Sequence, residues 1–567
     1  MSIVPEVAAG ADRGGRLALI QRWYLRVGLF ILPLAYSWGT YDSYVLPKLL
    51  AARMLVIGLL VLFIARALTT RALVVKRTPL DLPLLAFVGS AALSTVFAYN
   101  QNVAVFGIYS RYDGLLTILT YALLFWLSVQ AVAGAGEART LLLVLLASGY
   151  VVAAVAIFQS VSDSLRQNAV VPAYGTLGQK NVLGAFLAML CPLAYCELVS
   201  ARSWGARVLA LNALAMCGIG LYLTFSRSAW IGVALAAIVV GVWVRGPGMR
   251  FAIASAAAIV LLAVGIAILA QAGGLQPERS DLAEFGDRPA VWRASLQLIA
   301  SRPLLGYGPD TFGLVFPHFQ IAYLNQQWDK AHAETLQVAA TQGLVGLAAY
   351  VLLLVAFIRA FWRGRQNAGA GAVVAAWVAY TATLQVNFST PAAGFPFWIF
   401  AAATMEVWGA TRTSSRQAPA HGRLVLAAAG LIGVPVLLAF SVFGIVLPYL
   451  ADASLLVAVN ADYSGRNRDA LAPAQQARMR GPRESVYAVE VGNVMFERSD
   501  WAGAREAYGE AAALGTYNRL VYRNLALADR NLGRLAEARV AAGQAVALDR
   551  FDAANQALLA QLAQRQS

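Results

Sequence analysis

Residues 49–68 read LLAARMLVIGLLVLFIARAL, an apolar run as long as the roughly 20 residues with which a helix crosses a bilayer. Similar runs lie at 115–132, 207–225, 251–270 and 424–447. Of the 567 residues, 59% are hydrophobic and only 13% are charged, whereas a soluble domain carries about 25% charged residues. The composition therefore predicts an integral membrane protein.

The hydrophobic pattern predicts an all-α, polytopic fold with about 12–13 transmembrane helices before residue 450. The expected spans are 27–42, 49–67, 80–97, 115–133, 140–158, 182–200, 207–225, 229–244, 250–271, 336–358, 370–388, 395–410 and 424–447. The three cysteines, Cys191, Cys196 and Cys217, all fall within these spans, and their spacing is not that of a zinc site or a disulfide framework.

The basic residues that produce the net charge of +15 lie mainly in alternate loops. These loops hold Arg13 to Arg26, Arg66 to Arg77, Arg139, Arg202 and Arg207, Arg245 and Arg250, Arg359 to Arg365, and Arg412 to Arg423. By the positive-inside rule these loops are cytoplasmic, so the other loops and the C-terminal tail are expected on the periplasmic side of a bacterial inner membrane. The basic balance thus reflects membrane orientation rather than nucleic-acid binding.

The sequence changes character after Tyr449, which predicts a membrane domain at 1–449 and a helical repeat domain at 450–567. Trp501–Tyr508 recurs as Leu535–Ala542, 34 residues later, and a weaker unit is expected around Tyr487–Arg498. This period resembles the tetratricopeptide repeat, a helical hairpin that stacks into a solenoid. Two roles stay open: the repeats bind a periplasmic protein partner or acceptor, or they only stabilise the outer face.

One long polar segment, residues 272–334, interrupts the membrane sequence and is predicted to be a periplasmic catalytic loop. It carries two of the three histidines, His318 and His332, together with several arginines and the ordered turn Pro303–Phe312. Loops of this length in compact proteins are usually functional or disordered, and the aromatic residues and turns here favour function.

Other ionisable residues are expected at the same membrane face. Arg111, Lys180 and Arg227 stand in the segments 106–117, 175–184 and 223–232. Charged residues bordering a hydrocarbon layer are costly, and arginine suits fork-like binding of phosphate oxygens. A neutral imidazole at His332 near Arg288 and Arg227 is a candidate general base, because neighbouring cations lower its pKa.

Several sequence motifs of the chain resemble those of a known family. The runs Arg288–Trp292, Pro303–Phe312 and Ala331–Gly346 are similar to the core of the O-antigen ligase and polymerase superfamily, over about residues 25–410. The LTFSRS motif ending at Ser228, GQKN ending at Asn181 and SRYDG ending at Gly114 match further family positions. The chain departs from the family beside Lys180, where a second asparagine is common, and at Ala333, where an asparagine usually follows the histidine.

This resemblance implies a membrane glycosyltransferase with a fold like that of the large C-type class. Its donor would be a glycan on undecaprenyl pyrophosphate, its acceptor a hydroxyl of lipid A core, another glycan or a protein, and no metal or other cofactor would be needed. The expected residues are His332, Arg288 and Arg227 for catalysis, with His332 as the base of an inverting displacement, and Arg111, Lys180, Asn181, Tyr307 and Trp292 for substrate binding. A polymerase, a protein O-oligosaccharyltransferase and a lipid-linked sugar transporter are the alternatives.

Overall fold

The computed structural model describes residues 3–243, 279–321, 323–324, 327–367, 369–417 and 433–564. The fold is all-α apart from one two-stranded ribbon. The expected span at 250–271 lies outside the described residues.

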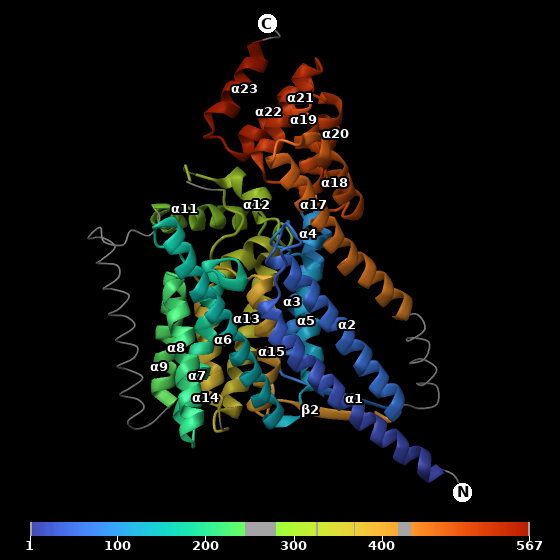
Figure 1. Cartoon of the computed structure of the whole chain (residues 1–567), viewed down its shortest axis with the longest axis vertical. Helices are drawn as coiled ribbons and strands as arrows, with labels where there is room; N and C mark the ends of the chain where they lie inside the picture. The colour runs from blue at the N-terminus through green and yellow to red at the C-terminus, as the bar shows by residue number, and fades with distance from the viewer. Residues whose placement is uncertain are drawn as a thin grey trace, which may run out of the picture.

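Eleven helices form the membrane bundle of the described chain, and they run up and down between two faces (Figure 1). They are α1 (Ile3–Ile31), α2 (Val45–Thr70), α3 (Asp81–Val96), α5 (Leu115–Ala131), α6 (Gly134–Gln167), α7 (Lys180–Ser200), α8 (Trp204–Leu223), α9 (Arg227–Trp243), α13 (Glu334–Gly364), α14 (Ala370–Leu384) and α15 (Pro391–Val407). A further helix runs from Gly433 to Tyr463. Seven helices of the described residues are long and apolar enough to cross a membrane, and four shorter ones are also apolar. The prediction of an all-α, multi-pass membrane protein is confirmed.

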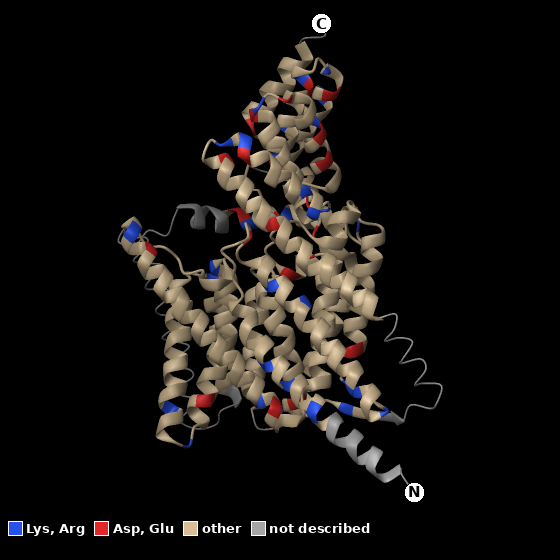
Figure 2. Cartoon of the chain, turned by 45° about the vertical axis from the view of Figure 1, so that its right-hand side comes forward, with Lys and Arg blue, Asp and Glu red and all other residues tan. Residues whose placement is uncertain are grey.

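The two faces of the bundle carry different elements. What we call the loop face, at the top of Figure 1, carries α4 (Gln101–Phe106), α11 (Arg279–Ser301), α12 (Phe312–Val315), the 3-10 turn η3 (Phe316–Phe319) and the C-terminal helices. The short 3-10 turns η1 (Leu32–Leu34) and η2 (Gly175–Leu177) lie between membrane helices. Most of the charged residues lie toward the two ends of the bundle and on the C-terminal helices (Figure 2).

The ribbon at the opposite face joins two segments far apart in the sequence. Strand β1 (Ala72–Arg77) pairs antiparallel with β2 (Arg412–Gln417), with Ala72 opposite Gln417. Lys76 on β1 donates to Glu406 on α15 at 2.7 Å. The ribbon thus ties the end of α2 to the end of α15.

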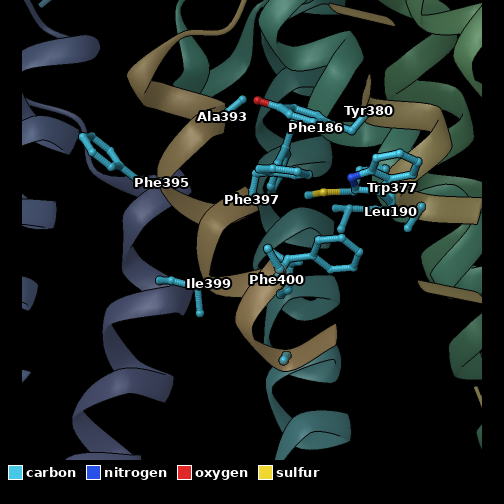
Figure 3. Packing of buried hydrophobic residues seen from close by; sticks show 14 of the residues in the cluster. Phe186, Leu190, Trp377, Tyr380, Ala393, Phe395, Phe397, Ile399 and Phe400 are labelled. Carbon is cyan, nitrogen blue, oxygen red and sulfur yellow. The ribbon is translucent and has the colours of Figure 1, made fainter. Parts of the chain in front are cut away.

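Helices α7, α14 and α15 form the centre of the bundle, where Phe186, Trp377, Tyr380, Phe397 and Phe400 pack together (Figure 3). Helix α15 is buried along nearly its whole length and contributes small residues, among them Ala392, Ala393, Gly394 and Ala401 to Ala403. Small residues let helices approach closely, which matters because lipid offers no hydrophobic driving force between helices.

The C-terminal helices repeat with a fixed period. They are α17 (Leu447–Tyr463), α18 (Asn467–Arg480), α19 (Ser485–Glu497), α20 (Trp501–Leu514), α21 (Arg519–Asn531), α22 (Leu535–Leu548) and α23 (Ala553–Gln564). Helices α18, α20 and α22 begin 34 residues apart, and so do α19, α21 and α23. The tetratricopeptide-like pattern is therefore present, and α19 is the unit expected at 487–498.

The connection between bundle and repeats is helical. The helix from Gly433 to Tyr463 is continuous through a π-helical turn, η4 (Val442–Val446), so the boundary predicted between residues 449 and 450 falls inside a helix. The domain limits themselves stay a prediction.

Candidate active site

The turn at residues 303–308 docks into a break in α13. Gly343, at φ 68°, interrupts the helix, and a Cβ there would lie 2.2 Å from the carbonyl oxygen of Leu304. The amides of Leu344 and Gly308 donate to the carbonyls of Pro303 and Thr341, at 2.7 and 2.8 Å. A side chain at position 343 would therefore displace the turn, which explains the glycine in the Thr341-Gln-Gly343 sequence. The break fixes the 303–308 turn onto α13.

A buried ionic network lies beneath this segment. Lys330 Nζ lies 2.8 Å from Asp113 Oδ2 and 2.7 Å from Asp310 Oδ1, and Asp310 Oδ2 accepts the amides of Ile108 and Asp113. Arg111 Nε lies 2.5 Å from Asp329 Oδ2. Burial alone would lower the pKa of Lys330, yet the two carboxylates raise it. The network thus holds the 107–114 loop against the chain just before His332.

His332 is buried between two aromatic rings. Its ring centroid lies 4.5 Å from that of Trp328 and 4.8 Å from that of Phe388. Burial and then the charge of Arg288 lower the pKa of His332 to about 3, against the opposing charge of Asp329. The imidazole is therefore neutral at physiological pH and has the protonation state that a general base needs.

Arg288 and Arg111 lie near enough to this imidazole that their charges lower its pKa, while the expected proximity of Arg227 to His332 stays a prediction. Arg288 is buried and donates from Nη1 to the carbonyl of Val386 at 2.7 Å, in the turn between α14 and α15. The guanidinium of Arg111 lies over the ring of Phe388, 5.4 Å from its centroid. We call His332, Arg288, Arg111, Asp113, Asp310, Asp329 and Lys330 the His332 cluster.

A second group of predicted residues joins the starts of α7 and α9. Asn181 Oδ1 accepts the hydroxyl of Ser226 at 2.9 Å, and the hydroxyls of Ser226 and Ser228 lie 3.1 Å apart. A Cβ on Gly184 would lie 2.9 Å from the Cβ of Ser226, so the glycine allows this close approach. Lys180 and Arg227 flank these contacts. We call Lys180, Asn181, Ser226, Arg227 and Ser228 the Arg227 group.

The packing of α9 relates the Arg227 group to the His332 cluster. A Cβ on Gly232 would lie 2.4 Å from the carbonyl oxygen of Ala379 and from the hydroxyl of Thr383, so α9 and α14 meet there. Arg227 lies five residues earlier, about 7.5 Å along the helix axis toward the loop face. Its exposed side chain therefore begins near the level of the Val386 carbonyl that binds Arg288.

The two aromatic residues predicted to bind substrate have packing contacts instead. Trp292 Nε1 donates to the carbonyl of Ala331 at 3.1 Å, next to His332. Tyr307 is buried, shares a hydrogen bond of 2.8 Å with Ser301, and lies under the guanidinium of Arg302. Both contacts support the loop, so substrate binding by Trp292 or Tyr307 stays a prediction without a contact of its own.

Unusual backbone angles concentrate at these positions. Eight non-glycine residues of the described chain have positive φ: Asp310 and His332 belong to the His332 cluster, and Ser110, Tyr112 and Phe225 directly adjoin members of the cluster or the group in sequence. Such conformations cost of order 1–3 kcal/mol each and persist only where the surroundings enforce them. Their clustering independently indicates a functional site here.

Sequence reasoning missed two features of the site. The 23-residue helix α11 lies inside the segment expected as a loop; its low hydrophobicity and the internal Pro289 concealed it. The Lys330–Asp113–Asp310 network was also missed, although the Tyr-Asp-Gly and Pro-Asp-Thr sequences around its aspartates were both noted as motifs. Among the described residues, no three His, Cys, Asp or Glu side chains gather as metal ligands would.

The C-terminal repeats contact the same face. Asn102 Nδ2 on α4 donates to the carbonyls of Arg483 and Leu514, at 2.8 and 3.1 Å. Asp452 on α17 accepts the hydroxyl of Tyr109 at 2.5 Å and the amide of Asp42 at 2.8 Å. The repeats are thus fixed to the loop that carries Arg111 and Asp113.

One family model matches the central segment of the chain. Residues 212–351 match the family model described as O-antigen ligase, a range that includes Arg227, Arg288, Trp292, Tyr307 and His332 but excludes Arg111, Lys180 and Asn181. No curated protein matches the chain.

Two solved structures are similar at low scores. The TPR domain of Arabidopsis OM64 has 15% identity and a TM-score of 0.20, covering 20% of this chain and 96% of that one. The APC/C hetero-tetramer Cut9–Hcn1 has 12% identity and a TM-score of 0.19, covering 91% and 87%. These scores are too low to support the fold, which rests on the helices and their 34-residue period. The chain is therefore a multi-pass membrane protein whose central segment matches the O-antigen ligase family and whose C-terminal helices form tetratricopeptide-like repeats.

Proposed function

We propose that the protein transfers a glycan from undecaprenyl pyrophosphate to an acceptor hydroxyl at the loop face. The observation that carries this proposal is the buried, neutral imidazole of His332 beside Arg288 and Arg111, in a segment that matches the O-antigen ligase family. The acceptor hydroxyl would give its proton to His332 as its oxygen attacks the anomeric carbon. Direct displacement of the pyrophosphate inverts that carbon.

The cations would act on the leaving group. Negative charge grows on the departing pyrophosphate, and preorganised guanidinium groups stabilise it without rearrangement. Arg288 is held in place by the Val386 carbonyl, whereas Arg227 and Lys180 stand at helix starts where backbone amides also favour an anion. We expect no divalent ion to be required; a transfer reaction abolished by excess chelator and restored by magnesium would refute that expectation.

Donor binding would also adjust the base. Burial and the charges of Arg288, Arg111 and Lys330 lower the pKa of His332. A pyrophosphate bound among these cations offsets their charge, so the pKa of His332 rises toward the range useful for proton transfer. The base would therefore become effective when the donor is bound.

A cavity beneath the cluster is suited to an apolar chain. It has a volume of about 140 Å³ and lies between α5, α13, α14 and α15, with Tyr121, Leu353 and Phe397 among its walls. Asp113, Asp310 and Lys330 line its polar end. We propose that part of the donor's lipid tail lies in this groove between spans.

The charge distribution supports the orientation. Arg26 pairs with Glu137, Lys76 pairs with Glu406, and Arg139 pairs with Glu197, and these residues lie toward the opposite face. By the positive-inside rule we expect that face to be cytoplasmic and the loop face to be periplasmic, in the bacterial inner membrane. A cysteine introduced at Asp500 should react with an impermeant thiol reagent added from the periplasmic side, and protection there would reverse the orientation.

The decisive experiment compares acceptors. Purified protein is given the lipid-linked glycan with lipid A core, with a second lipid-linked glycan, or with a protein acceptor, and glycan transfer is measured by mass spectrometry. Transfer to lipid A core identifies a ligase, chain extension identifies a polymerase, and transfer to protein identifies an oligosaccharyltransferase. No transfer to any of the three, with wild-type glycan profiles after gene deletion, would contradict the proposed function.

A further inference from the structure

The repeats and the membrane segment enclose a crevice outside the cavity described above. Its volume is about 450 Å³, within the range of small-ligand sites. One wall comes from described residues between Gly313 and Trp328, and the other comes from the start of α21 with the turn before it and from the turn between α22 and α23. We call this space the repeat crevice. Neither wall is complete without the other part of the chain.

The two walls are joined by specific contacts. Gln327 Nε2 donates to the carbonyl of Tyr517 at 3.3 Å. The ring of Tyr517 packs over Gly313, where an added Cβ would lie 3.3 Å from it and 3.1 Å from the Cα of Asp329. Burial and then the charge of Asp329 raise the pKa of Tyr517 to about 12. A repeat residue therefore reaches the edge of the His332 cluster.

Trp328 connects the crevice to the candidate base. Its side chain lines the crevice, and its ring lies 4.5 Å from that of His332. The residue is only 3% exposed, and its indole N–H has no hydrogen-bond partner in the part of the chain that the structure describes. A buried donor without a partner costs free energy unless a water or ligand accepts from it. Trp328 is therefore shared between the wall of the crevice and the surroundings of His332.

Two aromatic rings of the crevice are exposed to solvent. Tyr323 is 66% exposed and Phe551 is 39% exposed, and their rings meet edge to face at 6.1 Å. One ring comes from the membrane segment and the other from the repeats. The face of an aromatic ring is electronegative and attracts the polarised C–H groups on the flat side of a sugar ring.

The polar side chains of the crevice are suited to binding the hydroxyl groups of a ligand. Gln320, Gln327 and Asn518 bring amides, which donate and accept. Arg519 brings the single guanidinium among the lining residues, and it is paired with Asp549 at 2.5 Å and with Asp552 at 3.3 Å. The lining therefore carries two carboxylates and one cation. An anionic ligand is thereby disfavoured, and a peptide would be expected on the extended concave surface of a solenoid rather than at its turns.

We propose that the repeat crevice is the acceptor subsite and that it binds a neutral, hydroxyl-rich saccharide. This inference rests on the proposed transfer reaction and names the acceptor class for the same site. The saccharide would stack on Tyr323 and Phe551 and place its reacting end past Trp328 toward His332. The repeats would then form one half of the acceptor site, and they would not be only a stabilising cap remote from it.

The first test measures binding without reaction. Water-soluble oligosaccharides are released by mild acid from the envelope of the producing cell and added to the full chain in lipid nanodiscs. Saturation-transfer NMR should show binding to the wild type and to the control Tyr463→Ala, which removes a tyrosine that is 85% exposed on α17. Tyr323→Ala and Phe551→Ala should weaken binding by about tenfold each, and Tyr323→Phe and Phe551→Tyr should restore it. The inference would be overturned if the alanine variants bound the oligosaccharides as tightly as the wild type does. It would also be overturned if a pool of envelope peptides bound the protein and their binding depended equally on both rings.

The second test measures transfer kinetics. Both alanine variants should raise KM for the acceptor more than KM for the lipid-linked donor, whereas Tyr463→Ala should change neither. If transfer depends on His332 while acceptor KM is unaffected in the crevice variants, the acceptor subsite is refuted and the proposed function stands. If the wild type transfers no glycan to any acceptor, the proposed function fails, whereas saccharide binding that depends on Tyr323 and Phe551 still supports the crevice as a saccharide site.

Discussion

The His332 cluster and the Arg227 group lie at the same face but are built differently. In the first, His332 and Lys330 are buried, the ion pairs are 2.5 to 2.8 Å long, and Asp310 and His332 have positive φ. In the second, hydroxyl and amide contacts support the chain while the side chain of Arg227 extends into an exposed position. The contrast indicates a preorganised reaction centre beside an open place where a charged ligand arrives. Substitutions in the two groups should therefore affect different kinetic constants.

The largest effect is expected from His332→Ala. Loss of the general base should lower kcat for glycan transfer by about 10²- to 10⁴-fold, with the protein still inserted and folded. His318→Ala is the matched control, because His318 belongs to the same segment but is exposed and outside the cluster. A kcat in His332→Ala equal to that of the wild type would show that His332 is not the general base. The proposed difference between the two groups would then no longer hold.

The next largest effect is expected from Arg288. Arg288→Ala should lower kcat/KM by about 10²-fold, because it removes a fixed cation and leaves the Val386 carbonyl without its donor. Arg288→Lys should recover only part of that loss, since an ammonium cannot make forked contacts. Thermal unfolding of both variants separates folding from catalysis, and full recovery by lysine would argue against forked phosphate binding.

A smaller effect is expected from Arg227. Arg227→Ala should raise KM for the lipid-linked donor by about tenfold and change kcat little, because an exposed cation contributes mainly to capture. Arg207→Ala serves as the control, because Arg207 is also exposed but lies near the start of α8, whereas Arg227 follows the end of that helix. A drop in kcat as large as that of Arg288→Ala would place Arg227 in the reaction centre instead.

The smallest effect is expected from pH. The pKa of His332 is about 3 in the folded protein and about 6.5 in an unfolded chain. Between these values the unfolded state binds more protons, so the free energy of unfolding decreases as pH falls below 6.5. The apparent melting temperature should fall between pH 7 and pH 5, and less steeply in His332→Gln; equal slopes in both proteins would show that His332 is not buried as a neutral group.

The sequence predicted the parts that depend on local physical chemistry. Apolar length predicted the membrane helices, because the bilayer thickness fixes how many residues a span needs. The recurrence of Trp501–Tyr508 at Leu535–Ala542 predicted the repeats, because alanines at the same helical positions allow the same close packing. The candidate residues at one face followed from counting spans, which alternate in direction.

Contacts between distant segments were beyond that reasoning. Lys330 binds Asp113 over more than 200 positions of sequence, and Asp452 on α17 binds Tyr109 over more than 300. The ribbon of β1 with β2 is of the same kind. No local periodicity encodes such pairs, because each segment alone has several equally suitable partners.

The sequence by itself determined a membrane bundle, a 34-residue helical repeat, and a set of cations and one histidine directed to one face. Only the tertiary structure decided which of them meet. The break at Gly343 admits the 303–308 turn, and folding brings His332 beside Trp328 and close to the charge of Arg288. The docking of Tyr517 on Gly313 brings the repeats to the same place. Burial and charge at His332 arise from this assembly, since both depend on atoms that the chain brings together only when it folds.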